Sequence, residues 1–231
     1  MSKKTNLFFN YDRFMRLPKY PSNRGGGTYH PKYEYKRGDC KCVNCTNWKK
    51  KIGCIVQICP YLEERVESGD ISFSELFNGL LNEHNNRTLN KRVNNYIKET
   101  LEMGTQFNSK AHQKRFERTL KSINKRNKSL VAVVYLLTAD LKVWNQCWSR
   151  MQHDNINIEQ IRLKKASAFG YTLFCAAKDI YLGSTYITVK DMADRGIIMP
   201  KEFNLICNAI GIKRYGLKAV YMLSDDTEQI A

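Results

Sequence analysis

The sequence lacks an apolar run long enough to cross a membrane. Its longest one, Leu130 to Leu137, is far shorter than the roughly 20 residues that span a bilayer, so it predicts a buried core helix. The stretch from Met1 to Leu17 interrupts its hydrophobic residues with Asn, Asp and Arg, and so lacks the apolar segment of a signal peptide. We therefore expect a cytoplasmic protein without a membrane partner.

The sequence also lacks a recognisable catalytic motif. It has no His-Glu-x-x-His pair, no Cys/His nucleophile signature, no phosphate-binding loop and no dinucleotide glycine motif. Five carboxylates could surround a divalent ion, although their spacing does not require it: Asp140, Asp154, Asp179, Asp191 and Asp194. We expect no enzymatic activity and no small-molecule substrate. A metal-dependent nuclease, or another enzyme that processes nucleic acid, is the alternative.

Acidic residues are few relative to basic ones. Lys and Arg number 38 against 22 Asp and Glu, which gives a formal net charge of +16 in 231 residues. Such a charge attracts polyanions, so RNA, DNA, a ribonucleoprotein or an acidic protein surface are the expected partners. Net charge alone does not choose among them.

Five of the eight cysteines fall within twenty residues: Cys40, Cys42, Cys45, Cys54 and Cys59. In a reducing cytoplasm such a cluster is more often a metal site than a set of disulfides. Two pairs, Cys42 with Cys45 and Cys54 with Cys59, predict one structural zinc held by four thiolates. Cys40 could replace Cys42 as a ligand, and the cysteines could instead hold an iron–sulfur cluster or stay as free thiols. The loop between the pairs presents Lys49, Lys50 and Lys51 to a nucleic acid or another partner.

The remaining cysteines, Cys147, Cys175 and Cys207, lie within apolar helical patterns, where a free cysteine behaves as a small hydrophobic residue. The fold class is mainly α: a helical domain with an N-terminal basic arm and a small zinc knuckle of four cysteines. The expected divisions are a basic aromatic arm over 1–37, the knuckle over 38–68, the helical domain over 69–224 and an acidic tail over 225–231.

Apolar periodicity, capping residues and glycines predict where the helices lie. We expect a short helix near 61–66, longer ones over about 73–82, 89–103, 109–127, 130–144, 157–183 and 200–211, and a short strand at 186–189. On the helix expected over 109–127, basic residues recur every three or four positions: Lys110, Lys114, Arg118, Lys121 and Lys125. We call these five residues the basic stripe. Like charges on one helical face repel each other, so the basic stripe indicates a polyanion or partner surface, against the alternative of a merely solvated face.

Three segments together resemble a domain family. They are Phe107 to Phe116, Val134 to Asp140 and Ala209 to Gly216, within roughly residues 105 to 216. The segments resemble a domain family of unknown function that is common on plasmids, phages and conjugative elements of Firmicutes. Asn208 stands where that resemblance implies an acidic residue. The cysteine segment is likewise similar to small knuckles encoded on such elements.

The resemblance implies an accessory protein of a mobile genetic element. Genes of this neighbourhood include anti-CRISPR proteins, so inhibition of a type II Cas nuclease is the sharper hypothesis. A basic inhibitor cannot mimic DNA, because its charge has the wrong sign; it would engage the guide RNA or an acidic face of the Cas ribonucleoprotein.

Overall fold

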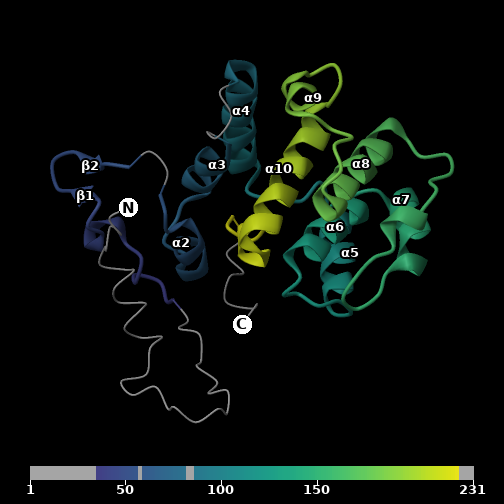
Figure 1. Ribbon diagram of the computed structural model, residues 1–231, viewed down its shortest axis with the longest axis horizontal. Helices are drawn as coiled ribbons and strands as arrows, with labels where there is room; N and C mark the ends of the chain where they lie inside the picture. Colours follow the sequence, from purple (N-terminus) through teal and green to yellow (C-terminus); the bar gives the residue numbers. More distant parts are fainter. Residues whose placement is uncertain (1–34, 57–58, 82–85, 224–231) are drawn as a thin grey trace, which may run out of the picture. The chain divides into compact units, whose positions relative to one another are not determined.

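The computed structural model describes residues 35–56, 59–81 and 86–223 (Figure 1). Of the expected basic arm, residues 1–34 lie outside the described residues, as does the expected acidic tail. The chain divides into two compact units, Met1–Ser72 and Phe73–Ala231. We call them the N-terminal unit and the helical unit. The division falls a few residues after the boundary that the sequence predicts between knuckle and helical domain.

The N-terminal unit combines a small hairpin with one short helix. Its elements are η1 (Cys42–Asn44), β1 (Trp48–Lys49), β2 (Gly53–Cys54) and α2 (Leu62–Ser68). The two strands pair antiparallel. Helix α2 confirms the short helix that the sequence predicts after the cysteines. It ends at Gly69, whose φ of 76° is left-handed and therefore suits glycine.

Asp70 ties the segment before the cysteines to the end of α2. Its carboxylate accepts hydrogen bonds from the backbone N–H groups of Gly38 and Cys40, each at 2.9 Å. Its carbonyl oxygen accepts from the Arg65 guanidinium, with Nη2 at 2.8 Å. These contacts join two stretches far apart in the sequence, in a unit too small to bury a large core.

The helical unit contains most of the helices. Its elements are α3 (Phe73–Leu81), α4 (Arg87–Met103), α5 (Lys110–Leu120), α6 (Lys128–Thr138), α7 (Leu141–Cys147), η2 (Trp148–Arg150), η3 (Ile158–Gln160), α8 (Ala168–Leu182), α9 (Val189–Ala193), α10 (Pro200–Tyr215) and η4 (Leu217–Ala219). The prediction of a mainly helical fold is confirmed. None of the helices in the described part of the chain is long and apolar enough to span a bilayer.

Helix α6 forms the centre of the helical unit. All of its residues from Leu130 to Leu137 are inaccessible to solvent, and it packs mainly against α8 and α10 (Figure 1). The sequence predicts this buried helix correctly but extends it to Trp144. The structure ends α6 at Thr138, because Asp140 caps a new helix, α7, by accepting hydrogen bonds from the N–H groups of Lys142 and Val143.

Two other predicted boundaries are wrong. The helix expected over 157–183 begins only at Ala168, where Ser167 is the N-cap, and the preceding loop places Lys165 at a left-handed φ of 52°. The strand expected at 186–189 is a loop that leads into α9. Thr188 starts that helix with a capping box, in which its side chain and that of Asp191 each bond the other residue's backbone.

Gly211 lies inside α10 and does not end it. The helix continues to Tyr215, and a Cβ at Gly211 would lie 3.1 Å from Cζ of Phe77 on α3. Glycine is therefore present to let α10 approach α3. The expected helix end at 211 is wrong because the sequence cannot separate a glycine that stops a helix from one that allows close packing.

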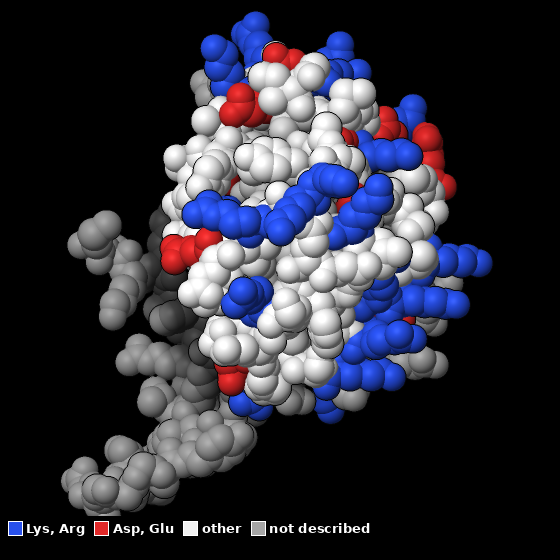
Figure 2. Space-filling view, turned by 90° about the vertical axis from the view of Figure 1, so that its right-hand side faces the viewer, with Lys and Arg blue, Asp and Glu red and all other residues white. Residues whose placement is uncertain are grey.

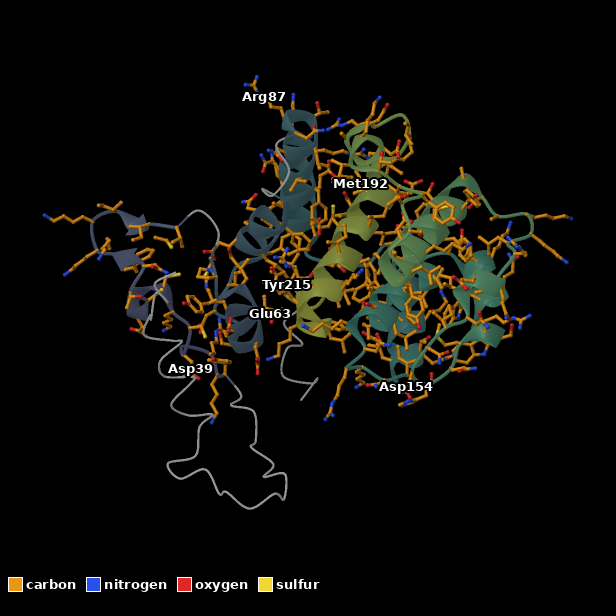
Figure 3. The ribbon with its side chains drawn as sticks, in the orientation of Figure 1. Asp39, Glu63, Arg87, Asp154, Met192 and Tyr215 are labelled. Carbon is orange, nitrogen blue, oxygen red and sulfur yellow. The ribbon has the colours of Figure 1, made fainter. Side chains whose placement is uncertain are left out.

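Buried Arg92 joins α4 to the segment around α9. Its guanidinium donates to the carbonyl oxygens of Met192 and Asp194, at 2.9 and 2.8 Å, and also to that of Ile198. The same group stacks on the Phe203 ring at 4.2 Å. Figure 3 places Met192 beside the upper end of α10, where these helices meet.

Candidate functional site

The first cysteine pair of the N-terminal unit lies on a tight turn. Cys42 begins the η1 turn, and the N–H of Cys45 donates to the Cys42 carbonyl at 2.9 Å. Both side chains are half-buried. A turn of this kind is how a Cys-x-x-Cys pair brings two sulfur atoms to the same side of the chain.

The hairpin carries the third cysteine back towards the first pair. Trp48 is paired with Cys54 across the hairpin, and the Trp48 ring lies over Gly53, whose φ of 83° requires glycine. The turn between the strands exposes Lys49, Lys50 and Lys51. All three lysines are therefore accessible to solvent on the segment between the cysteine pairs.

The donor set fits zinc in its chemistry, since four thiols can supply the soft ligands that this ion prefers. Burial raises the pKa of Cys59, and the Cys54 thiol close by adds to that rise. Among the described residues, however, no group of three or more His, Cys, Asp or Glu side chains is gathered closely enough to hold a metal ion. The zinc site formed by Cys42, Cys45, Cys54 and Cys59 therefore stays a prediction.

Cys40 differs from these four cysteines in its surroundings. Its side chain is 1% exposed, and burial raises the pKa of its thiol to about 11 even though the Ser68 hydroxyl bonds to it. Cys40 thus packs against α2. This position favours Cys42 over Cys40 as the ligand of the first pair.

The basic stripe is split by an early end of its helix. Ser109 caps α5 by accepting from the N–H of His112 at 3.1 Å, and α5 ends at Leu120 instead of reaching 127. Lys110, Lys114 and Arg118 lie on the helix, whereas Lys121 is its C-cap residue and Lys125 follows in a turn. The predicted helix boundary is wrong.

Tertiary contacts explain why α5 stops where it does. The N–H groups of Lys121 and Ser122 bond back only three residues, which tightens the last turn. The N–H of Asn124 then donates to the carbonyl of His153 at 2.7 Å and so leaves the helical path. All five cations of the basic stripe nevertheless remain exposed.

The cations of the basic stripe have no partners in the described part of the chain. None of their five side chains forms an ion pair or a hydrogen bond there. Arg115, on the same helix, behaves differently: its Nε donates to the Thr138 carbonyl at 2.8 Å and so fastens α5 to the end of α6. The helix thus carries one cation with a structural contact and a separate row of unengaged ones.

Below the basic stripe, α5 is anchored by a buried histidine. Nε2 of His112 lies 2.8 Å from the Tyr135 carbonyl, and its Nδ1 accepts from the Asn108 N–H at 3.2 Å. Burial lowers the pKa of His112 to about 4, so the ring is neutral and donates from Nε2. This contact fixes the rotation of α5 about its axis, and therefore which face of the helix turns the cations towards solvent.

Asn208 lies at the centre of a buried polar network. Its Oδ1 accepts from the Tyr96 hydroxyl and from Nε2 of Gln106, and its Nδ2 donates to the Tyr135 hydroxyl and the Gln106 carbonyl. A carboxylate could not donate two hydrogen bonds. The two donated hydrogen bonds therefore explain why an amide occupies the position at which the family resemblance implies an acidic residue.

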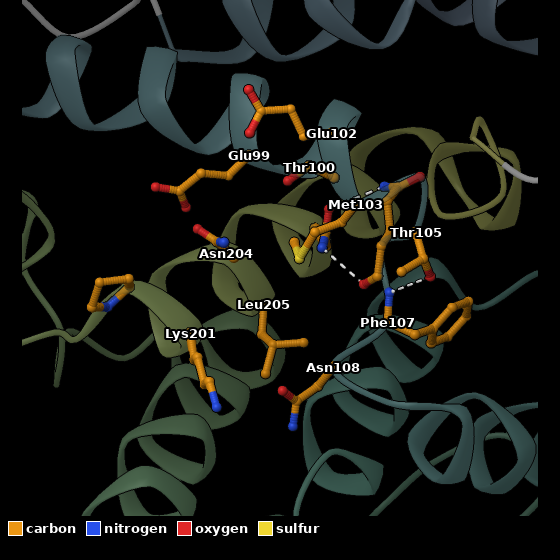
Figure 4. Close-up of a pocket in the computed structure, with 13 residues that line it drawn as sticks. Glu99, Thr100, Glu102, Met103, Thr105, Phe107, Asn108, Lys201, Asn204 and Leu205 are labelled. Atoms are coloured by element: carbon orange, nitrogen blue, oxygen red, sulfur yellow. Dashed lines mark hydrogen bonds between the residues drawn. The ribbon is translucent and has the colours of Figure 1, made fainter.

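A pocket of about 480 Å³ opens beside this network, between the end of α4, the following linker and the start of α10 (Figure 4). Its lining includes Met103 and Leu205 together with Glu99, Glu102 and Lys201. Two exposed carboxylates against one ammonium make this pocket a poor site for a phosphate. The basic stripe is the better candidate for a polyanion.

The five carboxylates that could have gathered around a divalent ion have separate structural contacts. Asp140 caps α7, Asp179 accepts from the loop before α9, and Asp191 belongs to the capping box of α9. Asp194 accepts from the Gly196 N–H, and Asp154 accepts from Asn124. Backbone and loop contacts thus account for each of them. Cys147, Cys175 and Cys207 are buried, as expected.

No protein-family model, no curated protein and no solved structure matches this chain. The resemblance to a family of mobile genetic elements therefore stays a hypothesis, and the candidate interface is defined by geometry and charge alone.

Proposed function

We propose that this protein binds nucleic acid through the basic stripe on α5, without catalysing a reaction on it. The observation that carries this proposal is the row of Lys110, Lys114 and Arg118, which are exposed, lie four residues apart on one helical face and lack partners among the described residues. Lys121 continues the row at the end of the helix.

The spacing of these cations suits a phosphate backbone. Four residues of α-helix advance about 6 Å, so the row from Lys110 to Arg118 extends over about 12 Å. A duplex presents a phosphate about every 3.4 Å along each strand, so such a row can meet several phosphates at once. Contacts of this kind fix the position of a protein on the backbone and do not read sequence.

The predicted zinc knuckle, here called the cysteine module, would supply a second contact with the nucleic acid. Lys49, Lys50 and Lys51 are exposed on the hairpin turn, and a four-thiolate zinc would hold this small hairpin rigid. Such a site has no open coordination position for water, so its contribution would be architectural. The module and the basic stripe belong to different units of the chain.

The basic stripe can be tested by the salt dependence of binding. The change is the triple variant Lys114→Gln, Arg118→Gln and Lys121→Gln, and the probes are RNA, DNA and a guide-loaded type II Cas ribonucleoprotein. Each cation that contacts a phosphate releases counterions, so its loss should lower the slope of log affinity against log salt by roughly one unit. We expect the triple variant to lose about two to three units of slope, with an unchanged circular dichroism spectrum.

The matched control removes the same charge elsewhere. Arg87, Lys91 and Lys98 are exposed on α4, and their triple replacement by Gln should leave the salt slope nearly unchanged. Equal binding by the parent and by the α5 triple variant would refute the interface. Equal losses in both triple variants would mean that only net charge matters.

The same binding reactions separate the anti-CRISPR and nuclease hypotheses. An inhibitor of a Cas nuclease should protect a target plasmid at about one molecule per nuclease, and its effect should depend on whether guide RNA was bound first. A nuclease would instead shorten the free RNA or DNA with turnover, in a manner that depends on a divalent metal.

A further inference from the structure

A second group of exposed side chains of the helical unit lies on α8 and on the loop after it, which are not the elements that carry the basic stripe. Tyr171 on α8 is 57% exposed and Tyr186, in the loop after α8, is 59% exposed. The Tyr186 N–H donates to Asp179 of α8, so both rings belong to the surface formed by this helix and the loop fastened to it. An exposed apolar surface that is rimmed by polar groups is typical of an interaction site.

A cation, Lys178, stands against the exposed Tyr186 ring and the buried Phe174 ring. Nζ of Lys178 lies 5.4 Å from the centre of the Tyr186 ring and 5.1 Å from that of Phe174. Lys178 comes two helical turns after Tyr171, so it lies on the same face of α8. We call Tyr171, Lys178 and Tyr186 the tyrosine platform.

The backbone beneath the tyrosine platform is firmly held. Asp179 accepts hydrogen bonds from the Tyr186 N–H at 2.9 Å, the Ile187 N–H at 2.8 Å and the Ser184 hydroxyl at 2.7 Å, which fastens the loop to α8. Tyr171 stands on α8 itself, one turn after its cap Ser167. Rings held in place in this way lose little conformational entropy when a ligand stacks on them.

Further cations flank the tyrosine platform in the sequence. Lys164 and Lys165 are exposed in the loop that leads into α8, and Lys190 is exposed on α9. The loop is fixed by Gln146, which accepts from the Lys164 N–H at 2.6 Å. Figure 2 turns the side of α7, α8 and their connecting loop towards the viewer, and Lys and Arg side chains outnumber carboxylates on that face.

We propose that the tyrosine platform stacks on unpaired bases, which makes single-stranded nucleic acid the partner of this protein. The inference rests on the proposed function, because it specifies the class of nucleic acid. Exposed aromatic rings with nearby cations match the chemistry of a single strand, whose bases offer free faces and whose phosphates carry negative charge. A duplex keeps its bases stacked internally and offers such rings no partner.

The test compares a single strand of about 15 nucleotides, a duplex of the same sequence and a single strand with abasic sites at its centre. Alanine at Tyr171 or at Tyr186 should weaken binding of the intact single strand about 5- to 100-fold, because stacking on one base is lost. Tyr171→Phe and Tyr186→Phe keep the ring and should bind as the parent does. Leu101→Ala, which removes an exposed side chain of α4, is the control and should have no effect.

The abasic strand isolates stacking from charge. It should bind the parent more weakly than the intact strand does, and Tyr171→Ala should weaken it no further. Neither tyrosine variant should change the salt slope, because no phosphate contact is removed. The triple variant of the basic stripe should change that slope, so the two proposals can be refuted independently of each other.

Two results would overturn the inference. If both alanine variants bind the intact single strand as the parent does while the α5 triple variant loses its salt slope, the basic stripe stands and the tyrosine platform is wrong. If Tyr171→Ala weakens binding to vesicles of anionic phosphatidylserine as strongly as binding to the single strand, the surface is a lipid contact and the base-stacking proposal falls.

Discussion

Replacing Asn208 with aspartate should destabilise the helical unit, and should do so more strongly at high pH. Asn208 is 3% exposed and uses both of its N–H bonds, one to the Gln106 carbonyl and one to the Tyr135 hydroxyl. A protonated carboxyl group keeps only one donor, which costs about 1 kcal/mol. An ionised one keeps none and is a buried charge.

The pH dependence follows from the same burial. A carboxyl group as buried as this one has its pKa raised by about 3 units or more, to about 7, against about 3.9 in the unfolded chain. Because the pKa is raised on folding, stability is retained below pH 3.9 and is lost as pH rises to 7, at about 1.4 kcal/mol per unit. Asn208→Asp should therefore cost about 2.5 kcal/mol at pH 5 and about 5 kcal/mol at pH 8.

Urea unfolding at the two pH values, followed by far-UV circular dichroism, measures these costs against the parent. Asn94→Asp, at an exposed position of α4, is the control and should change stability by less than about 0.5 kcal/mol at either pH. The reasoning is refuted if Asn208→Asp costs the same at pH 5 and pH 8. In that case solvent or a cation would reach the carboxylate, and the site of Asn208 would not be sealed from water.

Two further predictions concern buried or clustered groups. One zinc per chain should be found by elemental analysis, should be lost in Cys54→Ser and should remain in Cys40→Ser; a metal-free, fully folded parent would contradict the site. Burial lowers the pKa of His112 to about 4, below the unfolded value of 6.5, so the parent should lose about 3 kcal/mol of stability as pH falls from 6.5 to 4. In His112→Gln that loss should shrink, and an unchanged acid profile would mean that His112 is not the group responsible.

Helices whose ends are set by nearby residues could be predicted from the sequence. The stop of α4 at Gly104 follows from the left-handed conformation that glycine adopts, with φ of 62°. The end of α5 could not be predicted, because Asn124 leaves the helix to bond His153 in a distant loop. Helix boundaries set by tertiary hydrogen bonds have no signal in a local pattern.

Part of the candidate site could likewise be predicted from the sequence, and part of it could not. Basic residues at helical spacing indicate a stripe whatever the exact end of the helix, so Lys110, Lys114 and Arg118 were identifiable. The tyrosine platform was not, because Tyr171 occurs within an apolar helical pattern in which its exposure cannot be read. The presence of Tyr186 on the same surface depends on the loop that Asp179 fastens to α8.

The net charge of the chain includes cations of two different kinds. Several donate to carbonyl oxygens near helix ends: Arg115 to Thr138 of α6, Lys213 to Ile180 of α8 and Lys128 to Arg214 of α10. A cation at a helix C-terminus stabilises the helix dipole and satisfies a carbonyl group, so these residues contribute to the fold. Only the unengaged cations are available to release counterions from a nucleic acid. The salt slope of binding should therefore be much smaller than the formal charge of +16 suggests, because it reports only the unengaged cations that contact phosphates.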